Sequence, residues 1–405
     1  NLVLDNIDDL AIIMTYENGK PLKESKAEII YASSFIDWFS EEGKRAYGRS
    51  IPATQPDKRI ITIKQPVGVC ALITPWNFPA AMITRKVAPA LAAGCSVIIK
   101  PAEQTPLSAS ALVYLAEKAG IPKGVINLLV ANNPIPIGKE LCDNFSVRKI
   151  SFTGSTEVGK ILIKDSANSV KRISMELGGN APLIVFNDAD IEVAVKETLA
   201  SKYRNSGQTC VCANRIFVQE GIYEKYSEAL AKKVNSFNVG DGFEDASDIG
   251  PLIDESGLKK VERHLEDAIS KGAKVLTGGK QPSLGGLYFE PTVLTEVQSN
   301  MVLFKEETFG PLAPLFKFKD ISEVVNMANN TNYGLAGYIF TKDINTAWQV
   351  SEELQFGMVG IKSGILSTEV APFGGVKESG IGREGAIEGI DEYMEIKYLC
   401  FGNIL

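Results

Sequence analysis

Cys210 is the residue of this sequence best suited to act as a nucleophile. It stands in Gly207-Gln-Thr-Cys-Val-Cys212, a glycine-containing turn between an expected helix and an expected strand. Such a turn presents a thiol to a cleft, and a thiolate attacks electrophilic carbon at neutral pH. Two other interpretations stay open. Cys210 and Cys212 could form half of a metal site, although the other four cysteines make no second cluster, or they could be small buried side chains.

Two further side chains follow expected strands and could assist a nucleophile. Glu176, in Met175-Glu-Leu-Gly-Gly-Asn180, ends an apolar strand where a doubly wound sheet opens its cleft, and burial there would raise its pKa toward that of a general base. Asn77, in Thr74-Pro-Trp-Asn-Phe-Pro79, could donate its amide to an oxyanion. The structural alternatives are an ion-paired glutamate and a proline-braced turn with a packed Trp76.

The segment Gly154-Ser-Thr-Glu-Val-Gly-Lys160 follows an expected strand and begins an expected helix. It fits the start of a P-loop, but Ile161 stands where Ser or Thr would hold magnesium, which argues against an NTPase. The sequence also lacks GxGxxG, the usual dinucleotide fingerprint. What remains is a tight turn at a helix N-terminus, which either binds a phosphate or serves only as a turn.

His264 is the one histidine among 405 residues, so sites that need two imidazoles are excluded and no metal site is expected. Its charged surroundings, from Glu262 to Asp267, predict a solvated position on the surface. Acid–base chemistry must then fall to Glu, Asp, Lys, Tyr or Cys.

Composition limits the partners and the compartment. A net charge of −7 argues against nucleic acid and membrane surfaces as partners. Six scattered cysteines predict thiols in a reducing compartment, the cytoplasm or else the mitochondrial matrix. The longest weakly polar run, Val87 to Ile99, is too short to span a membrane. The chain begins inside an expected helix over residues 2–14, so we expect that its start, with any targeting segment, is missing.

Short apolar runs alternate with helical periodicity, which predicts an α/β fold of two doubly wound, Rossmann-like domains. Expected strands cover 69–73, 96–100, 125–130, 149–152, 172–177, 183–186, 215–219, 313–318 and 337–341, with others near 275 and 292. Expected helices cover 82–93, 106–119, a segment from 156, 190–204 with Asp190 as N-cap, 223–237, 258–270 and 321–329.

Two segments break this alternation, residues 48–65 and 392–400. Both have the pattern of extended strands although they are far apart in sequence. We predict that they protrude and pair as a small β oligomerisation element at a subunit boundary. An ordinary edge hairpin and a docked tail fit the pattern equally well.

In order and spacing, these motifs resemble those of the NAD(P)-dependent aldehyde dehydrogenase superfamily. Four further segments carry the same resemblance: Lys100-Pro-Ala-Glu103, Phe152-Thr-Gly-Ser155, Glu306-Glu-Thr-Phe-Gly-Pro311 and Pro372-Phe-Gly-Gly375. The resemblance covers essentially the whole chain, which looks like a member of that family without its N-terminal segment. Arg204-Asn-Ser-Gly-Gln-Thr-Cys-Val-Cys-Ala-Asn214 and Met82-Ile-Thr-Arg-Lys-Val87 most resemble the succinate-semialdehyde dehydrogenase branch.

The resemblance implies a role for each matched residue. Cys210 is the implied nucleophile, Glu176 the general base, and Asn77 the oxyanion donor together with the Cys210 backbone N–H. The implied cofactor contacts are Trp76, Lys100, Glu103, Gly154, Ser155, Leu177, Glu307 and Phe309. The residues implied to bind a distal substrate carboxylate are Arg85, Arg204 and Ser367. Cys212 resembles a second cysteine that, in some relatives, can form a disulfide with the nucleophile and so inactivate it.

The implied reaction is oxidation of succinate semialdehyde to succinate through a thiohemiacetal and a thioester on cysteine. NAD is the favoured cofactor because Glu103 would repel a 2′-phosphate, while the nearby Lys100 leaves NADP possible. Another semialdehyde, such as glutarate semialdehyde, and a catalytically silent structural relative are the alternatives. One departure is Lys362, where the family usually has Asn, because a cation there could disturb the loop that leads to Ser367.

The same resemblance predicts the domains and the assembly. Residues 1–47 and 67–177 would form the NAD(P)-binding domain, and residues 178–385 the catalytic domain. Residues 48–66 and 386–405 would supply the oligomerisation strands and a C-terminal tail. The expected assembly is a homodimer or a homotetramer.

Overall fold

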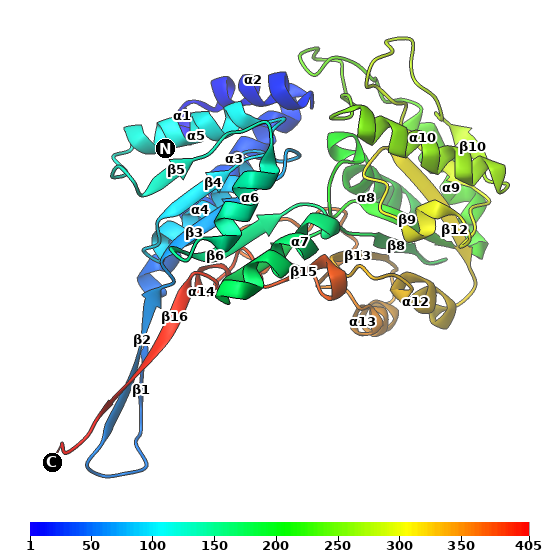
Figure 1. The fold of residues 1–405 in the computed structure, drawn as a ribbon. Coiled ribbons are helices and arrows are strands. Elements are labelled where there is room, and N and C mark those ends of the chain that lie inside the picture. The colour runs from blue at the N-terminus through cyan, green and yellow to red at the C-terminus, as the bar shows by residue number, and fades with distance from the viewer. Residues whose placement is uncertain (405) are drawn as a thin grey trace.

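The computed structural model describes residues 1–404 as two α/β lobes with a long β-arm (Figure 1). Each lobe is built on one sheet of mainly parallel strands, and a third sheet forms the arm. The predicted fold class of two doubly wound domains with a small β element is therefore confirmed.

The sheet of the first lobe has the strand order β15-β7-β6-β3-β4-β5. Its strands are β3 (Val69–Ile73), β4 (Val97–Lys100), β5 (Ile126–Leu128), β6 (Val147–Thr153), β7 (Arg172–Glu176) and the antiparallel edge strand β15 (Gly380–Ile381). Its helices are α1 (Leu2–Asp5), α2 (Ile7–Asn18), α3 (Leu22–Glu42), α4 (Ala81–Ala92), α5 (Pro106–Lys118), α6 (Pro134–Asp143), α7 (Thr156–Ser166) and α14 (Glu388–Asp391).

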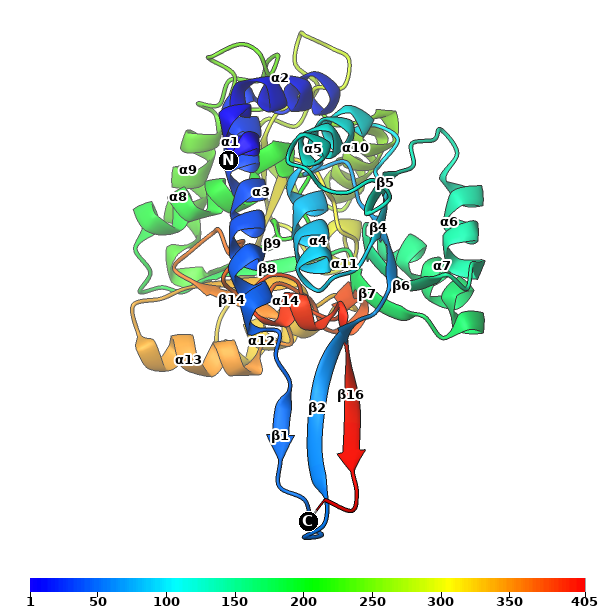
Figure 2. The same cartoon turned by 90° about the vertical axis from the view of Figure 1, so that its left-hand side faces the viewer.

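Alternation along β3 explains how this sheet is covered on both faces. Cys70 and Leu72 pack into the core under α3, α4 and α5, whereas Ala71 and Ile73 pack into the core under α6 and α7. Successive side chains of a strand point to opposite faces, so a strand buried on both sides is apolar throughout. Figure 2 shows α3 and α4 on one side of this sheet and α6 and α7 on the other.

The sheet of the second lobe has the order β10-β11-β12-β9-β8-β13-β14. Its strands are β8 (Ala181–Val185), β9 (Ala213–Gln219), β10 (Lys274–Thr277), β11 (Thr292–Thr295), β12 (Leu312–Phe318), β13 (Ala336–Phe340) and β14 (Met358–Ile361). Its helices are α8 (Ile191–Lys202), α9 (Tyr223–Val234), α10 (Glu255–Ser270), α11 (Val302–Lys305), α12 (Ile321–Asn329) and α13 (Ile344–Glu353).

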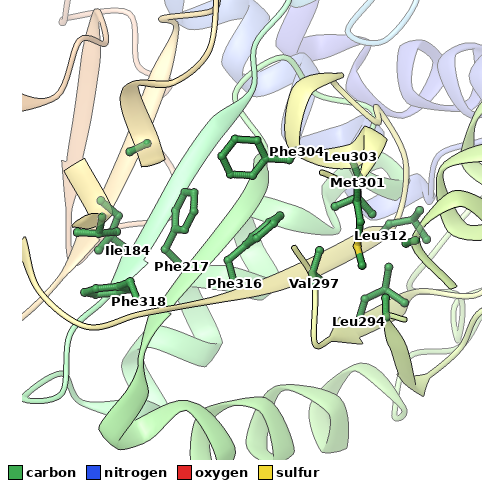
Figure 3. Packing of buried hydrophobic residues seen from close by; sticks show 14 of the residues in the cluster. Ile184, Phe217, Leu294, Val297, Met301, Leu303, Phe304, Leu312, Phe316 and Phe318 are labelled. Atoms are coloured by element: carbon green, nitrogen blue, oxygen red, sulfur yellow. The ribbon is translucent and has the colours of Figure 1, made fainter. Parts of the chain in front are cut away.

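Aromatic rings fill the core on one face of this second sheet (Figure 3). Phe217 of β9 lies 5.3 Å from Phe316 of β12, and Phe304 of α11 lies 5.4 Å from Phe316, measured between ring centroids. The first pair is tilted and the second is edge-to-face, and such ring pairs add to the free energy gained by burying each ring. The cluster fixes α11 against the sheet and so positions the segment that follows it, which carries Glu306 and Glu307.

The arm contains β1 (Arg49–Ile51), β2 (Arg59–Pro66) and β16 (Met394–Phe401), with β2 in the middle (Figure 2). β2 and β16 pair antiparallel from Pro66–Met394 to Arg59–Phe401. The predicted pairing of the two irregular segments is therefore present. The side chains of β16 are largely exposed in the single chain, including Ile396 at 64% and Tyr398 at 59%, whereas those of β2 are mostly half-buried.

Two local features differ from the expected elements. The expected helix over residues 2–14 is interrupted at Asn6, where the backbone leaves the helical region and the side-chain amide donates to Leu2 O at 2.8 Å. The sequence pattern also did not single out α3, which buries one long face in the first lobe. The predicted domain boundaries stay predictions, and β15, from the range expected for the catalytic domain, pairs with β7 of the first sheet.

Candidate active site

Most of the residues singled out in the first lobe follow the carboxyl ends of adjacent parallel strands. Trp76 and Asn77 follow β3, Lys100 ends β4, Gly154 follows β6, and Glu176 ends β7. In a doubly wound sheet this edge is where ligands bind, because the connecting loops diverge there. The shared edge brings side chains together that are up to a hundred residues apart in sequence.

A buried ion pair fixes the loop that carries Asn77. Lys20 Nζ lies 2.6 Å from Glu28 Oε2 and also donates to Asn77 O at 2.6 Å. The other oxygen of Glu28 accepts from the Ala80 backbone N–H at 2.9 Å, next to the N-terminus of α4. A carboxylate at that end of a helix is also stabilised by the helix dipole. The pair therefore holds the Asn77 loop between α3 and α4.

The Asn77 side chain reaches from the first lobe to the segment that carries Cys210. Its Nδ2 donates to Gln208 O at 2.9 Å, while Asn205 Nδ2 donates back to Asn77 O at 2.9 Å. A primary amide has two N–H donors, so one hydrogen of Asn77 stays free for an oxyanion beside Cys210.

Cys210 and Glu176 both lie in an environment that disfavours charge. Burial raises the pKa of Cys210 to about 12, and Arg85 opposes this shift. Burial also raises the pKa of Glu176 well above its usual value, and the nearby Glu384 adds to the effect. Neither carboxyl oxygen of Glu176 has a hydrogen-bond partner within residues 1–404. This carboxyl group is therefore free to accept a proton.

Glu384 balances two buried cations beside the base. Its Oε2 lies 2.5 Å from Arg85 Nε, and its other oxygen pairs with Lys86 Nζ. All three side chains are almost fully buried. The cations hold the pKa of Glu384 below its usual value despite burial, which raises it. Sequence reasoning missed Lys86 and Glu384, because their partnership spans 298 residues.

Cys210 opens into a cavity of about 220 Å³ that also contains the three predicted substrate residues, Arg85, Arg204 and Ser367. The cavity lining further includes Lys20, Glu24, Ala27, Glu28, Tyr31, Phe78, Met82, Thr209, Val211 and Phe373. Four of these lie on one face of α3, at helical spacing. That spacing was the available signal for them, and it identifies the side chains of α3 that line the cavity.

The predicted cofactor residues lie around the ends of β4, β6 and β7. Ser155 is the N-cap of α7 and accepts from the Val158 backbone N–H at 3.3 Å. A Cβ at Gly154 would come within 2.4 Å of the Phe152 ring, so only glycine fits this turn. Lys100 Nζ pairs with Glu103 Oε1. Leu177, directly after β7, is buried and packs against Gly159 of α7.

Glu307 and Phe309 approach the same edge from the second lobe. Glu307 Oε1 accepts from the Gly179 backbone N–H at 2.9 Å, and burial raises the pKa of Glu307 to about 7. The ring of Phe309 stands edge-on to Trp76, with centroids 5.6 Å apart. Side chains of both lobes therefore meet at this edge of the first sheet.

The predicted surface position of His264 is wrong. The side chain is fully buried, because His264 lies on the same face of α10 as Leu258, Val261, Leu265 and Ala268. Its Nδ1 lies 3.1 Å from Thr308 Oγ1, so it braces the segment next to Glu307. Burial lowers the pKa of His264 to about 4. Its neighbours Arg263 and Glu266 are exposed, and the sequence interpretation overlooked the helical periodicity that separates them from the buried residues.

Cys212 and Lys362 do not line the cavity around Cys210. Cys212 Sγ is buried, 3.3 Å from Gly207 O and 3.7 Å from Lys202 Nζ, so its role as a redox partner stays a prediction. Lys362 is exposed, and its loop is anchored by the Gly364 backbone N–H, which donates to Glu197 Oε2 at 2.8 Å. The effect of Lys362 on activity likewise stays a prediction.

Comparison with known proteins decides the family. Residues 1–399 match the model of the aldehyde dehydrogenase family. This chain belongs to the aldehyde dehydrogenase family. It is 57% identical over 404 residues to a glutarate-semialdehyde dehydrogenase of Pseudomonas aeruginosa, covering 100% of this chain and 83% of the relative.

Two further relatives have the same overall similarity. A succinate-semialdehyde dehydrogenase [NADP(+)] of Escherichia coli is 57% identical over 402 residues, which cover 99% of this chain and 83% of that enzyme. The crystal structure of succinate-semialdehyde dehydrogenase from Burkholderia pseudomallei superposes with a TM-score of 0.98 at 57% identity, covering 99% of this chain and 83% of that one.

Proposed function

We propose that this aldehyde dehydrogenase oxidises succinate semialdehyde to succinate with NAD(P) as hydride acceptor. The observation that carries the proposal is the single cavity in which Cys210 faces Arg85, Arg204 and Ser367. A thiol suits the aldehyde end of such a substrate, and cationic and hydroxyl donors suit its carboxylate end. The names of the relatives from Escherichia coli and Burkholderia pseudomallei support the same substrate.

The reaction begins with a proton transfer, because burial keeps the Cys210 thiol protonated. The thiol releases its proton to solvent, and the Cys210 sulfur then attacks the aldehyde carbon. The free hydrogen of the Asn77 amide stabilises the thiohemiacetal oxyanion, an interaction of about 3–4 kcal/mol for a well-placed donor. Loss of hydride leaves a thioester on Cys210, and Glu176 deprotonates the water that hydrolyses it to the acid.

The residues around the ends of β3, β4, β6 and β7 suit a dinucleotide. The N-terminus of α7, capped by Ser155 and reached through the close turn at Gly154, suits a phosphate. Lys100 and Glu103 would hold the adenosine ribose, while Leu177, Glu307 and the Trp76–Phe309 pair would hold the nicotinamide end. The nicotinamide supplies the acceptor for the hydride.

We propose NAD as the preferred cofactor, with NADP also accepted. The carboxylate of Glu103 repels a 2′-phosphate, but its ion pair with Lys100 reduces that repulsion. The Escherichia coli relative, named for NADP, shows that a similar enzyme takes the phosphorylated cofactor.

The second candidate is a glutarate-semialdehyde dehydrogenase, the name of the Pseudomonas aeruginosa relative. Both substrates end in a carboxylate and differ by one methylene, which is worth only about 1–3 kcal/mol in a pocket. The deciding experiment compares kcat/KM for succinate semialdehyde, glutarate semialdehyde and butanal, each with NAD and with NADP. The proposal requires the highest value for succinate semialdehyde, and a higher value for glutarate semialdehyde or butanal would overturn it.

We also propose that the arm mediates homo-oligomerisation. It exposes apolar side chains on a narrow sheet, among them Ile51, Ile396, Tyr398 and Phe401. Exposed apolar strands of this kind favour pairing with a second copy. The free cysteines support our proposal of a reducing compartment, the cytoplasm or the mitochondrial matrix. Within residues 1–404, no helix is both long and apolar enough to cross a membrane.

A further inference from the structure

Asn214 is the extra residue of a bulge in β9. Ala213 and Arg215 of β9 pair with Ala181 and Pro182 of β8, which are consecutive, so Asn214 stands between two paired positions. A bulge bends its strand and re-aims the side chain of the extra residue, and bulges are frequent next to active sites. Asn214 is almost fully buried, so its amide needs hydrogen-bond partners inside the protein.

The amide of Asn214 holds the backbone on both sides of Glu307. Its Nδ2 donates to Glu306 O at 3.1 Å, and its Oδ1 accepts from the Thr308 backbone N–H at 3.0 Å. A residue in a neighbouring parallel strand would bind the same two groups with its own N–H and C=O. The two hydrogen bonds therefore fix the course of the chain at Glu307.

The same amide is tied to the turn that the Glu307 carboxylate contacts. Glu307 Oε1 accepts from the Gly179 backbone N–H at 2.9 Å. The next residue, Asn180, accepts with its Oδ1 from Asn214 Nδ2 at 2.6 Å. Both N–H donors of the Asn214 amide are thus in use, one toward the Glu307 segment and one toward this turn. Asn214 therefore sets the distance between Glu307 and the end of β7.

The position of the Glu307 carboxylate is costly to maintain. Burial raises the pKa of Glu307 to about 7, because a charged carboxylate is disfavoured away from water. A binding site needs its acceptor to be in place before the ligand arrives, and residues behind that acceptor must supply the rigidity. The hydrogen bonds of Asn214 supply it on both sides of Glu307.

We propose that Asn214 is a positioning residue for the cofactor, whose amide fixes Glu307 where its carboxylate accepts a hydrogen bond from the nicotinamide ribose. This inference rests on the proposed function, because that function assigns Glu307 to the nicotinamide end. It goes further by naming the residue that holds Glu307 in place and by linking this hold to the strand that follows Cys210.

Binding of NAD and of ADP to Asn214→Ala tests the proposal, with Kd measured by isothermal titration calorimetry. ADP is the second probe because it contains the adenosine half of the cofactor and lacks the nicotinamide ribose. Loss of a hydrogen bond to a charged group should raise Kd for NAD by about tenfold. Kd for ADP should stay unchanged, which also shows that the variant is folded.

Ser201→Ala is the matched control. Ser201 Oγ accepts from the Ala213 backbone N–H at 3.1 Å, one residue before Asn214, so the control also removes a buried hydrogen bond to β9. It should leave Kd for NAD and for ADP unchanged. Asn214→Ser, whose side chain is too short to reach both Glu306 and Thr308, is a second variant and should give the same result as Asn214→Ala.

A double-mutant cycle with Glu307→Ala separates positioning from a general structural effect. Glu307→Ala alone should raise Kd for NAD, and adding Asn214→Ala should raise it by less than about twofold more, because the supported contact is already lost. If the two effects multiply, or if ADP is weakened as much as NAD, the role of Asn214 is overturned while the function stands. If Glu307→Ala alone leaves Kd for NAD unchanged, the assignment of Glu307 and this inference are both overturned.

Discussion

The proposed chemistry depends on two single residues whose burial disfavours their charged forms. Cys210 and Glu176 both have raised pKa values, and each must lose a proton during the reaction. A raised pKa moves ionisation to higher pH, so the reactive, deprotonated form of each group becomes more abundant as pH rises. Acid–base chemistry in this cavity should therefore be favoured by alkaline conditions.

The first prediction concerns the pH profile. We expect kcat/KM for succinate semialdehyde to rise continuously from about pH 6 to about pH 9, because kcat/KM reports the ionisation of the free enzyme. The measurement is a set of initial rates in buffers of constant ionic strength, with stability controlled at each pH. A profile that is flat across this range would contradict the raised pKa values.

The second prediction concerns His264, the one histidine of the chain, whose NMR signals need no assignment in tag-free protein. Its imidazole should titrate with a pKa of about 4, because burial disfavours the charged imidazolium. The folded state therefore prefers the neutral ring. The associated stability is complete above about pH 6.5 and is lost as pH falls toward 4, by about 3 kcal/mol in total. A titration near pH 6.5 would show that the ring is solvated.

At the scale of elements, sequence patterns predicted what depends on local periodicity. The strand ends that carry Asn77, Gly154 and Glu176 follow from apolar runs, and α12 spans the residues expected for it. The partners that depend on tertiary contact could not be predicted in this way. Glu384 is 298 residues from Lys86, and Tyr31 lines the cavity beside Cys210 only because α3 lies next to the Cys210 segment.

The third prediction concerns the contact between α3 and the Asn77 loop. Lys20→Met should lower the free energy of unfolding by about 3 kcal/mol or more, because it leaves the Glu28 carboxylate buried without its cation. It should also lower kcat, since Asn77 loses its anchor. Lys23→Met is the control, because Lys23 is 56% exposed and should matter by less than about 0.5 kcal/mol. Equal stability of the two variants, measured by chemical denaturation, would contradict the role of the buried pair.

The fourth prediction concerns the arm. Replacing Ile396 and Tyr398 of β16 by lysine should convert the oligomer to smaller species in sedimentation velocity, because charges would be buried at the proposed interface. Lys397→Glu, on the opposite face of the same strand, should have little effect. An unmodified chain that sediments as a monomer would overturn the proposed role of the arm.

At the scale of the whole molecule, the two lobes and the arm have separate tasks. The first lobe presents the ends of its parallel strands, and the second supplies Cys210 and Glu307 to the same cleft. The resemblance in sequence was enough to predict this organisation and the family. It was not enough to predict the buried ion pairs of Arg85 and Lys86 with Glu384, which form only in the folded chain.

In the proposed mechanism, Cys210 carries the substrate as a thioester, and Glu176 activates the water that hydrolyses it. Rapid mixing of the Glu176→Gln variant with NAD and succinate semialdehyde, followed by intact-mass and peptide mass spectrometry, tests it most directly. We expect a burst of reduced cofactor of one equivalent per active site, slow turnover afterwards, and one succinyl group on Cys210. A burst without a covalent adduct, or an adduct on another residue, would contradict it.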